Sequence, residues 1–179
     1  SVRSSAGDFE GAERSVLTIK KELDGRSCFS LDGLDDTRAL GEKIAAVLRP
    51  GMTLLMRGEL GAGKTTLVRE LCRALGWKRT CSPSFALVNE YARARIPVAH
   101  ADLYRLEHVD GRDLGFDEYL DNGWVLIIEW PERLARADFE DVWRCEMSVS
   151  AAGEKRCFCV GAAGKTARNA LAQLEKACS

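Results

Sequence analysis

Hydrophobic positions in the middle of the chain fall into two kinds of pattern. Residues 52–57 (MTLLMR) and 124–130 (WVLIIEW) are apolar runs, which are typical of strands buried on both faces of a parallel sheet. Residues 64–76 (KTTLVRELCRALG) instead repeat apolar side chains at the spacing of one helix face, and Gly76 stands where a C-terminal cap belongs. This order predicts a strand, then a glycine-rich loop, then a helix.

The flanking patterns extend the prediction to a mixed α/β domain. Residues 35–51 (DDTRALGEKIAAVLRPG) predict a helix whose N-cap is Asp35 or Asp36. Residues 142–150 alternate apolar and polar and predict a strand, which turns into a second strand over 155–160. We further predict strands within 15–23, 27–31, 85–92 and 96–104, and helices within 113–123 and 167–178.

Length and composition indicate one domain with a tail. The 179 residues suffice for a single well-buried α/β domain. The first residues are small and polar without any period, which is typical of disorder. We therefore divide the chain into an N-terminal extension, residues 1–25, which is partly disordered, and a single domain, residues 26–179.

Charge and hydropathy give no support to two classes of partner, although a local basic patch remains possible. The net charge is −1, so no broad basic field attracts nucleic acid or anionic lipid to the chain by itself. No apolar run reaches the roughly 20 residues of a membrane span, and no secretory signal pattern opens the chain. We expect no membrane association.

The seven cysteines are scattered, and none forms a C-x-x-C pair. They are Cys28, Cys72, Cys81, Cys145, Cys157, Cys159 and Cys178. A zinc site or a disulfide framework is expected to show paired spacing, so this pattern favours buried reduced thiols. Reduced thiols in turn imply the cytoplasm.

The glycine-rich loop carries the clearest chemistry. Gly58, Gly61 and Gly63 precede Lys64 and Thr65 in the string GELGAGKT, a P-loop pattern. Glycines let the backbone wrap closely around an oxyanion, and the amides of the loop and of the following helix then point at the phosphates. The lysine supplies positive charge, and the threonine hydroxyl is a magnesium ligand. We predict a three-layer P-loop NTPase fold, with a mixed β-sheet flanked by helices.

A second, similar string is not interpreted as a phosphate site. It reads GAAGKT over residues 161–166, between a predicted strand and a predicted helix. Where a P-loop has its first glycine, five residues before Gly164, this chain has Cys159, so the loop is too short to encircle a phosphate. We interpret it as a strand-to-helix turn.

A P-loop site also needs a carboxylate for the magnesium shell, at the end of a neighbouring buried strand. Glu129 ends the run VLIIE and is the first candidate; Asp102, which ends another predicted strand, is the second. His100 shares a face with Asp102 and is either structural or catalytic. Ser82 and Ser84 either contact the γ-phosphate or its attacking water, or only form a turn.

Five strings in this order resemble the TsaE family of small bacterial ATPases. They are GELGAGKTTLVRELCRALG, SPSFALVNEY, HADLYRLE, LGFDEYL and IIEWPERL, and the resemblance runs from about Cys28 to Val160. It implies an accessory ATPase for N6-threonylcarbamoyladenosine formation in tRNA, which acts on a complex of the proteins TsaB and TsaD. The family's cofactors are ATP or ADP and Mg²⁺, and tRNA is reached only through the complex.

The resemblance also implies roles for single residues. Lys64, Asp102 and Glu129 are the implied catalytic residues, and Thr65 and Glu129 the implied magnesium ligands. Trp130 matches a tryptophan beside the acidic residue, and the helix entry near Thr37 borders the adenine. The implied nucleotide-binding residues are Glu59, Leu60, Gly61, Ala62, Gly63, Lys64, Thr65, Thr66 and Arg156.

Two other functions remain open on the sequence. A P-loop small-molecule kinase would need an acceptor pocket and usually an arginine-rich lid, and the chain shows no long lid insertion. A nucleotide-binding scaffold without significant turnover has the same sequence features as a slow ATPase. A GTP-driven switch is disfavoured because the guanine-reading Asn-Lys-x-Asp string is absent. We expect weak intrinsic hydrolysis that depends on partners, because no arginine finger is evident in cis.

Overall fold

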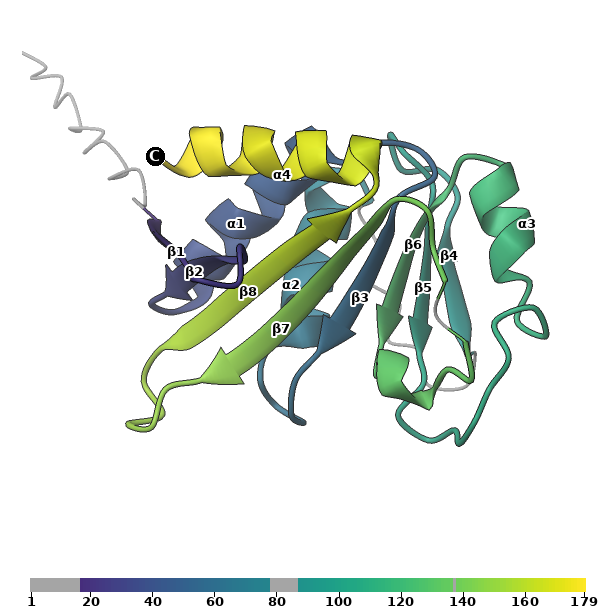
Figure 1. The fold of residues 1–179 in the computed structure, drawn as a ribbon, viewed down its shortest axis with the longest axis horizontal. Helices are drawn as coiled ribbons and strands as arrows, with labels where there is room; N and C mark the ends of the chain where they lie inside the picture. The colour runs from purple at the N-terminus through teal and green to yellow at the C-terminus, as the bar shows by residue number, and fades with distance from the viewer. Residues whose placement is uncertain (1–16, 78–86, 137) are drawn as a thin grey trace, which may run out of the picture.

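A mixed sheet with helices on both faces forms the protein (Figure 1). The computed structural model describes residues 17–77, 87–136 and 138–179. Within these residues the sheet has eight strands in the order β1-β2-β8-β7-β3-β6-β5-β4. They are β1 (Thr18–Lys21), β2 (Ser27–Leu31), β3 (Thr53–Arg57), β4 (Val88–Tyr91), β5 (Val98–Asp102), β6 (Val125–Glu129), β7 (Val142–Val149) and β8 (Arg156–Ala163).

The centre of the sheet is parallel and its two sides are antiparallel. Strand β3 pairs in parallel with β6 on one side and β7 on the other, and β5 pairs in parallel with β6. Strand β4 is antiparallel to β5, while β8 is antiparallel to both β7 and β2. The two apolar runs therefore form neighbouring central strands, as predicted. Their carboxyl ends meet at one edge of the sheet, where an α/β fold binds its ligands.

The helices complete three layers. They are α1 (Leu34–Val47), α2 (Lys64–Ala74), α3 (Phe116–Asp121), the 3₁₀ turn η1 (Pro131–Arg133) and α4 (Lys165–Cys178). Alternate residues of one strand point into separate cores: Leu54 and Met56 pack in the core under α1, α2 and α4, whereas Leu55 packs in the core that includes Phe116 of α3. The predicted mixed, three-layer arrangement is confirmed.

Helix α1 begins differently from the prediction. The residue at its N-cap is Gly33, and no side chain caps it there. The Asp36 carboxylate instead accepts a hydrogen bond from the backbone N–H of Asp32, 2.7 Å away and upstream of the helix. The predicted N-cap at Asp35 or Asp36 is wrong. The helix begins after Gly33, and the Asp36 carboxylate binds a backbone N–H upstream of the helix rather than one in its first turn.

The predicted N-terminal extension contributes a strand to the sheet. Residues 1–16 lie outside the described part of the chain. Strand β1 lies inside the predicted extension and pairs with β2 in a register that sets Ile19 opposite Phe29. Ordered structure thus begins before residue 26, while the division into an extension and one domain stays a prediction.

The cysteines are the main correction to the sequence analysis. Cys28 and Cys159 form a disulfide, and they stand directly opposite each other in the antiparallel β2–β8 pair with 4.0 Å between their Cα atoms. Because 131 residues separate them, no local spacing indicated the pair. The prediction of reduced thiols is therefore wrong for these two residues, and the argument for a reducing compartment loses its basis.

Other cysteines are buried free thiols, as predicted. Cys72, Cys145 and Cys178 are buried and free, and Cys157 is free but half-buried. Burial raises the pKa of the Cys72 thiol to about 12 and also raises the pKa of Cys145. Cys81 lies outside the described residues.

None of the helices in the described ranges is long and apolar enough to cross a bilayer.

Candidate nucleotide and magnesium site

A cleft of about 380 Å³ opens where the carboxyl ends of β3, β5 and β6 meet. The predicted phosphate loop and the start of α2 form one wall of the cleft, and Asp102 and Glu129 form another. The start of α1 and Arg156 of β8 complete it. The structure therefore brings together residues as far apart in the sequence as Gly33 and Arg156, which are 123 positions apart.

The loop between β3 and α2 needs glycine at two positions. Gly58 has φ +138°, and a Cβ there would collide with the backbone carbonyl oxygen of Met147 on β7. Gly63 has φ +106°, and its Cβ would lie 3.1 Å from Cδ of Arg156. Both residues occupy a region of φ that disfavours side chains, and both are packed against a neighbouring strand. The loop is thereby held close to β7 and β8.

The start of α2 is open for an anion, whereas that of α4 is not. Gly63 caps α2 without a side-chain hydrogen bond. At α4, the carboxylate Oδ1 of Asp141 accepts the backbone N–H of Ala167 at 3.0 Å, and a Cβ on Gly164 would collide with the same carboxylate oxygen. The helix N-terminus after the second glycine string is therefore already met by a negative charge. This string forms a strand-to-helix turn, as interpreted from the sequence.

Lys64 is folded into the loop. Its ammonium donates to the backbone oxygens of Gly58 at 2.5 Å and Glu59 at 3.0 Å, and it lies 4.4 Å from the ring centroid of Trp130. The side chain is only 4% exposed. An ammonium has three N–H donors, so two carbonyls leave one for a phosphate. A buried cation at the base of a glycine loop raises the local affinity for an anion.

Thr65, Glu129 and His100 form a connected polar group at the floor of the cleft. The Thr65 hydroxyl lies 3.1 Å from each carboxylate oxygen of Glu129, and it donates to that carboxylate. His100 Nε2 lies 2.8 Å from Glu129 Oε1. Because an ionised carboxylate only accepts hydrogen bonds, Nε2 carries the proton. Glu129 is 2% exposed, so its carboxylate is stabilised by these two donors and by groups in the cleft rather than by bulk water.

This donor set fits a magnesium ion. Mg²⁺ prefers hard oxygen ligands and is usually held by one or two carboxylates together with phosphates and water. The hydroxyl of Thr65 and the carboxylate of Glu129 are adjacent oxygens that face the same cleft as the phosphate loop. The predicted pair of metal ligands therefore lies together.

Asp102 lines the cleft beside Glu129, but its carboxylate has a local contact. The two residues are opposite each other in the β5–β6 register. Asp102 Oδ1 accepts the backbone N–H of Tyr104 at 3.1 Å, which stabilises the turn after β5. The predicted catalytic role of Asp102 stays a prediction, and its contact with Tyr104 indicates that it also shapes the cleft wall.

The far end of the cleft contains weaker candidates. Thr37 is buried, and its hydroxyl donates to the backbone oxygen of Gly33 at 3.2 Å, inside the first turn of α1. Leu34 is exposed at the same turn and lines the cleft. An exposed leucine beside the start of a helix suits the flat apolar face of a base better than the engaged Thr37 hydroxyl does. Arg156 faces this region from β8.

The remaining predicted nucleotide residues differ in how they could act. Leu60, Gly61, Gly63 and Thr66 line the cleft. Glu59 and Ala62 do not, and they shape the loop through the hydrogen bond from the Ala62 N–H to the Glu59 oxygen, 3.1 Å. Ser82 and Ser84 lie outside the described residues.

Two contributors to the site were not singled out as such from the sequence. Tyr104 lines the cleft and its ring centroid lies 4.9 Å from that of Trp130, which has an unusual φ of +58°. Leu34 is the second. Tyr104 stands two residues after Asp102 on a predicted strand end, a position that could have marked it.

Known proteins share sequence and fold with this chain. The model of the family described as threonylcarbamoyl adenosine biosynthesis protein TsaE matches residues 31–157. The chain is 40% identical over 111 residues to the tRNA threonylcarbamoyladenosine biosynthesis protein TsaE of Synechocystis, covering 59% of this chain and 71% of that protein. The corresponding protein of Aquifex aeolicus is 41% identical over 106 residues, which are 58% of this chain and 75% of that protein.

A third relative and a solved structure complete the comparison. The TsaE protein of Bacillus subtilis is 39% identical over 97 residues, which are 54% of this chain and 61% of that protein, so the match spans less than two thirds of its length. The crystal structure of Bacillus subtilis YdiB superposes with a TM-score of 0.71 at 25% identity, over 90% of this chain and 99% of YdiB. The fold is thus shared along nearly the whole of both chains.

Proposed function

The chain belongs to the TsaE family of threonylcarbamoyl adenosine biosynthesis proteins, and from this we propose that it is a weak Mg²⁺-dependent ATPase that supports N6-threonylcarbamoyladenosine formation in tRNA. It acts on the complex of TsaB and TsaD, and it meets tRNA only through that complex. We expect it in the cytoplasm, where tRNA is modified.

One observation carries the proposal. The Thr65 hydroxyl and the Glu129 carboxylate are 3.1 Å apart beside a glycine loop with a buried lysine and an uncapped helix start. A cation site and an anion site within one cleft are what a Mg–nucleotide complex requires. A structural glycine turn alone would need neither the buried ammonium nor the buried carboxylate.

Each residue then has a chemical task. The loop and helix amides bind the phosphates, and Lys64 offsets their charge. Thr65 and Glu129 would hold Mg²⁺, which when bound neutralises charge that develops on the phosphate oxygens. His100 keeps the Glu129 carboxylate oriented, and Asp102 is the second carboxylate at the reacting end.

Hydrolysis by the isolated chain is expected to be slow. Phosphoryl transfer is accelerated strongly by an arginine that reaches the transferred phosphate. Arg156 borders the cleft, where its side chain packs against Gly63, and we propose it as a nucleotide-binding residue rather than as such an arginine. A group supplied by the partner complex would complete the site, so turnover should rise when the complex is added.

The decisive experiment measures ATP turnover by the chain alone, with TsaB–TsaD, and with candidate small-molecule acceptors. We expect slow turnover alone, a rise with TsaB–TsaD, and loss of both in Lys64→Ala. Lys165→Ala is the matched control, because that lysine occupies the corresponding position of the second glycine string. ATP consumption only with a small acceptor would indicate a kinase, and no turnover in any mixture would indicate a scaffold.

A further inference from the structure

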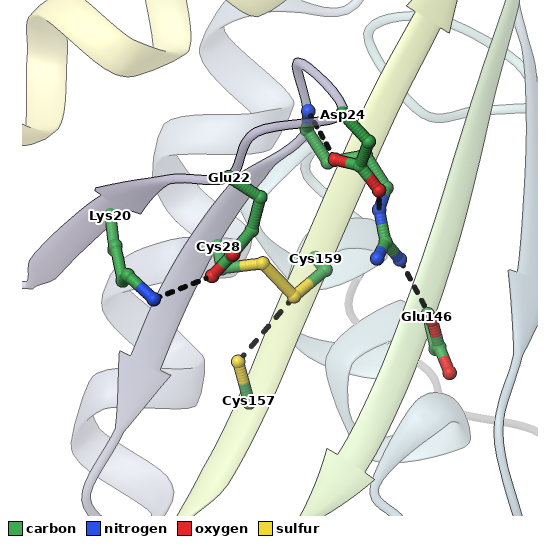
Figure 2. The surroundings of a disulfide bond; sticks show 8 residues. Lys20, Glu22, Asp24, Cys28, Glu146, Cys157 and Cys159 are labelled. Carbon is green, nitrogen blue, oxygen red and sulfur yellow. Dashed lines mark hydrogen bonds and ion pairs between the residues drawn. A yellow bond between two sulfur atoms is a disulfide. The ribbon is translucent and has the colours of Figure 1, made fainter.

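Three cysteines gather on the face of the sheet opposite the α1–α2 core (Figure 2). Cys157 and Cys159 are two residues apart on β8, so both side chains point to the same face. Phe158 between them points to the other face and is fully buried in the core. Cys28 joins them from β2, opposite Cys159 in the register. None of the three cysteines lines the nucleotide cleft, although Cys157 directly follows Arg156, which does.

The three sulfur atoms are close enough to share one ion. All lie within 4.8 Å of one another, and Cys157 Sγ is 3.6 Å from Cys159 Sγ. Two thiolates on a tetrahedral Zn²⁺, each about 2.3 Å from the metal, lie about 3.8 Å apart. The Cys157–Cys159 pair therefore already has the separation that one zinc ion requires. Cys28 needs only to move out of bonding contact with Cys159.

We propose that Cys28, Cys157 and Cys159 bind one thiophilic metal ion such as Zn²⁺ once the Cys28–Cys159 disulfide is reduced. A dithiol reductant supplies two electrons and two protons, becomes a disulfide itself, and leaves Cys28 and Cys159 as thiols. The ion then displaces one proton from each of the three thiols. Three sulfur ligands leave one coordination position for water or another small ligand.

Charged side chains lie beside the cluster. The turn between β1 and β2 folds beside it, and the Arg26 guanidinium bridges Asp24 at 2.7 Å and Glu146 at 2.9 Å (Figure 2). Three thiolates and one divalent ion carry a net charge of −1 in total. Arg26 and Lys20 are both engaged in ion pairs with neighbouring carboxylates, so the charge of the thiolates is offset mainly by the bound ion itself.

The test uses the full chain reduced with a phosphine and titrated with Co²⁺ as a spectroscopic probe, followed by displacement with Zn²⁺. We expect one equivalent of Co²⁺ with a sulfur-to-metal charge-transfer band, and no such band in protein that keeps its disulfide. Cys157→Ser should weaken Zn²⁺ binding by at least about 10-fold, the lower limit for losing even a hydrogen-bonding partner of a metal ligand.

The matched control is Cys178→Ser, which removes a buried free cysteine of α4 outside the cluster. It should bind Co²⁺ like the wild type. ADP affinity reports that each variant is folded, and the ATPase assay is read separately, so failure of the metal proposal leaves the proposed function untouched. A wild-type band in Cys157→Ser or Cys28→Ser, or no band in the reduced wild type, would overturn the proposal.

Discussion

His100 Nε2 lies 2.8 Å from Glu129 Oε1, and both side chains are at least 97% buried. The two residues sit on the neighbouring parallel strands β5 and β6, on the same face of the sheet. A buried carboxylate needs hydrogen-bond donors to offset its desolvation, and His100 Nε2 is one such donor in this position. We therefore propose His100 as a positioning residue that acts through Glu129; the sequence left open whether it is structural or catalytic.

We predict that His100→Leu lowers ATP turnover by about 10- to 100-fold, the usual effect of removing the partner that orients a metal ligand. His100→Gln should restore part of the activity, because its amide N–H can reach the same carboxylate oxygen. The distinguishing measurement is the Mg²⁺ dependence of turnover. It should shift to higher Mg²⁺ in His100→Leu, whereas a purely structural loss would lower turnover at every Mg²⁺ concentration alike.

Lys64→Ala should reduce hydrolysis by about 100- to 1,000-fold, the range found when one preorganised group that stabilises developing charge is removed. The lysine contacts loop carbonyls and a ring rather than the apolar core, so the fold should persist. Lys165→Ala should be nearly silent, because Asp141 already meets the α4 N-terminus. Equal losses in both variants, with both folded, would contradict the assignment of the two glycine strings.

Glu129→Gln should abolish turnover while ADP binding without metal is retained. The amide keeps an oxygen that can accept the Thr65 hydroxyl, but it loses the charge that attracts Mg²⁺. Calorimetric titration with ADP in chelator and with ADP in excess Mg²⁺ separates ADP binding without metal from the contribution of Mg²⁺. If ADP binding in chelator disappears together with turnover, then Glu129 holds the fold of the loop and the metal assignment is wrong.

Much of this site was predictable because its signals are local. A glycine loop between an apolar run and a helix is visible within residues 52–76, and Glu129 is the acid that ends the next apolar run. The Thr65–Glu129 contact then follows from strand order, because β6 lies directly beside β3. These are the elements for which the sequence pattern and the fold impose the same arrangement.

The missed features depend on contacts between distant segments. The disulfide joins β2 to β8 across 131 residues, and only the antiparallel register makes the two cysteines neighbours. Asp36 resembles an N-cap in sequence, yet its carboxylate bonds to the Asp32 N–H because α1 starts earlier, at Leu34. Neither choice between competing partners can be read from residue type and spacing alone.

The Cys28–Cys159 disulfide should contribute measurably to stability. It closes a loop that spans 131 residues, and cross-linking so long a loop is expected to stabilise by about 2–5 kcal/mol. In urea unfolding in chelator, adding a phosphine reductant should lower the free energy of unfolding of the wild type by this amount. Cys28→Ser has no disulfide to reduce, so the reductant should leave its midpoint unchanged. A reductant effect of the same size in Cys28→Ser would contradict this.

A row of contacts leads from the phosphate loop to the surface. Lys64 Nζ lies 4.4 Å from the ring centroid of Trp130, and that ring lies 4.9 Å from the ring of Tyr104, which is 43% exposed. A nucleotide that shifts the Lys64 ammonium would therefore change the packing of Trp130 and, through it, of the exposed Tyr104 ring. Aromatic residues of this kind are enriched among the few that dominate binding energy at interfaces.

We predict that Tyr104→Ala weakens the ATP-dependent binding of this chain to TsaB–TsaD by about 10-fold or more, as truncation of an aromatic hot spot commonly does. Tyr104→Phe keeps the ring against Trp130 and should bind like the wild type. Binding is compared with an ATP analogue, with ADP and without nucleotide, and ADP affinity is measured for each variant. The row of contacts has no signalling role if Tyr104→Ala binds the complex like the wild type in all three states. The same conclusion follows if its loss of binding matches an equal loss of ADP affinity, because the defect then lies in the nucleotide site itself.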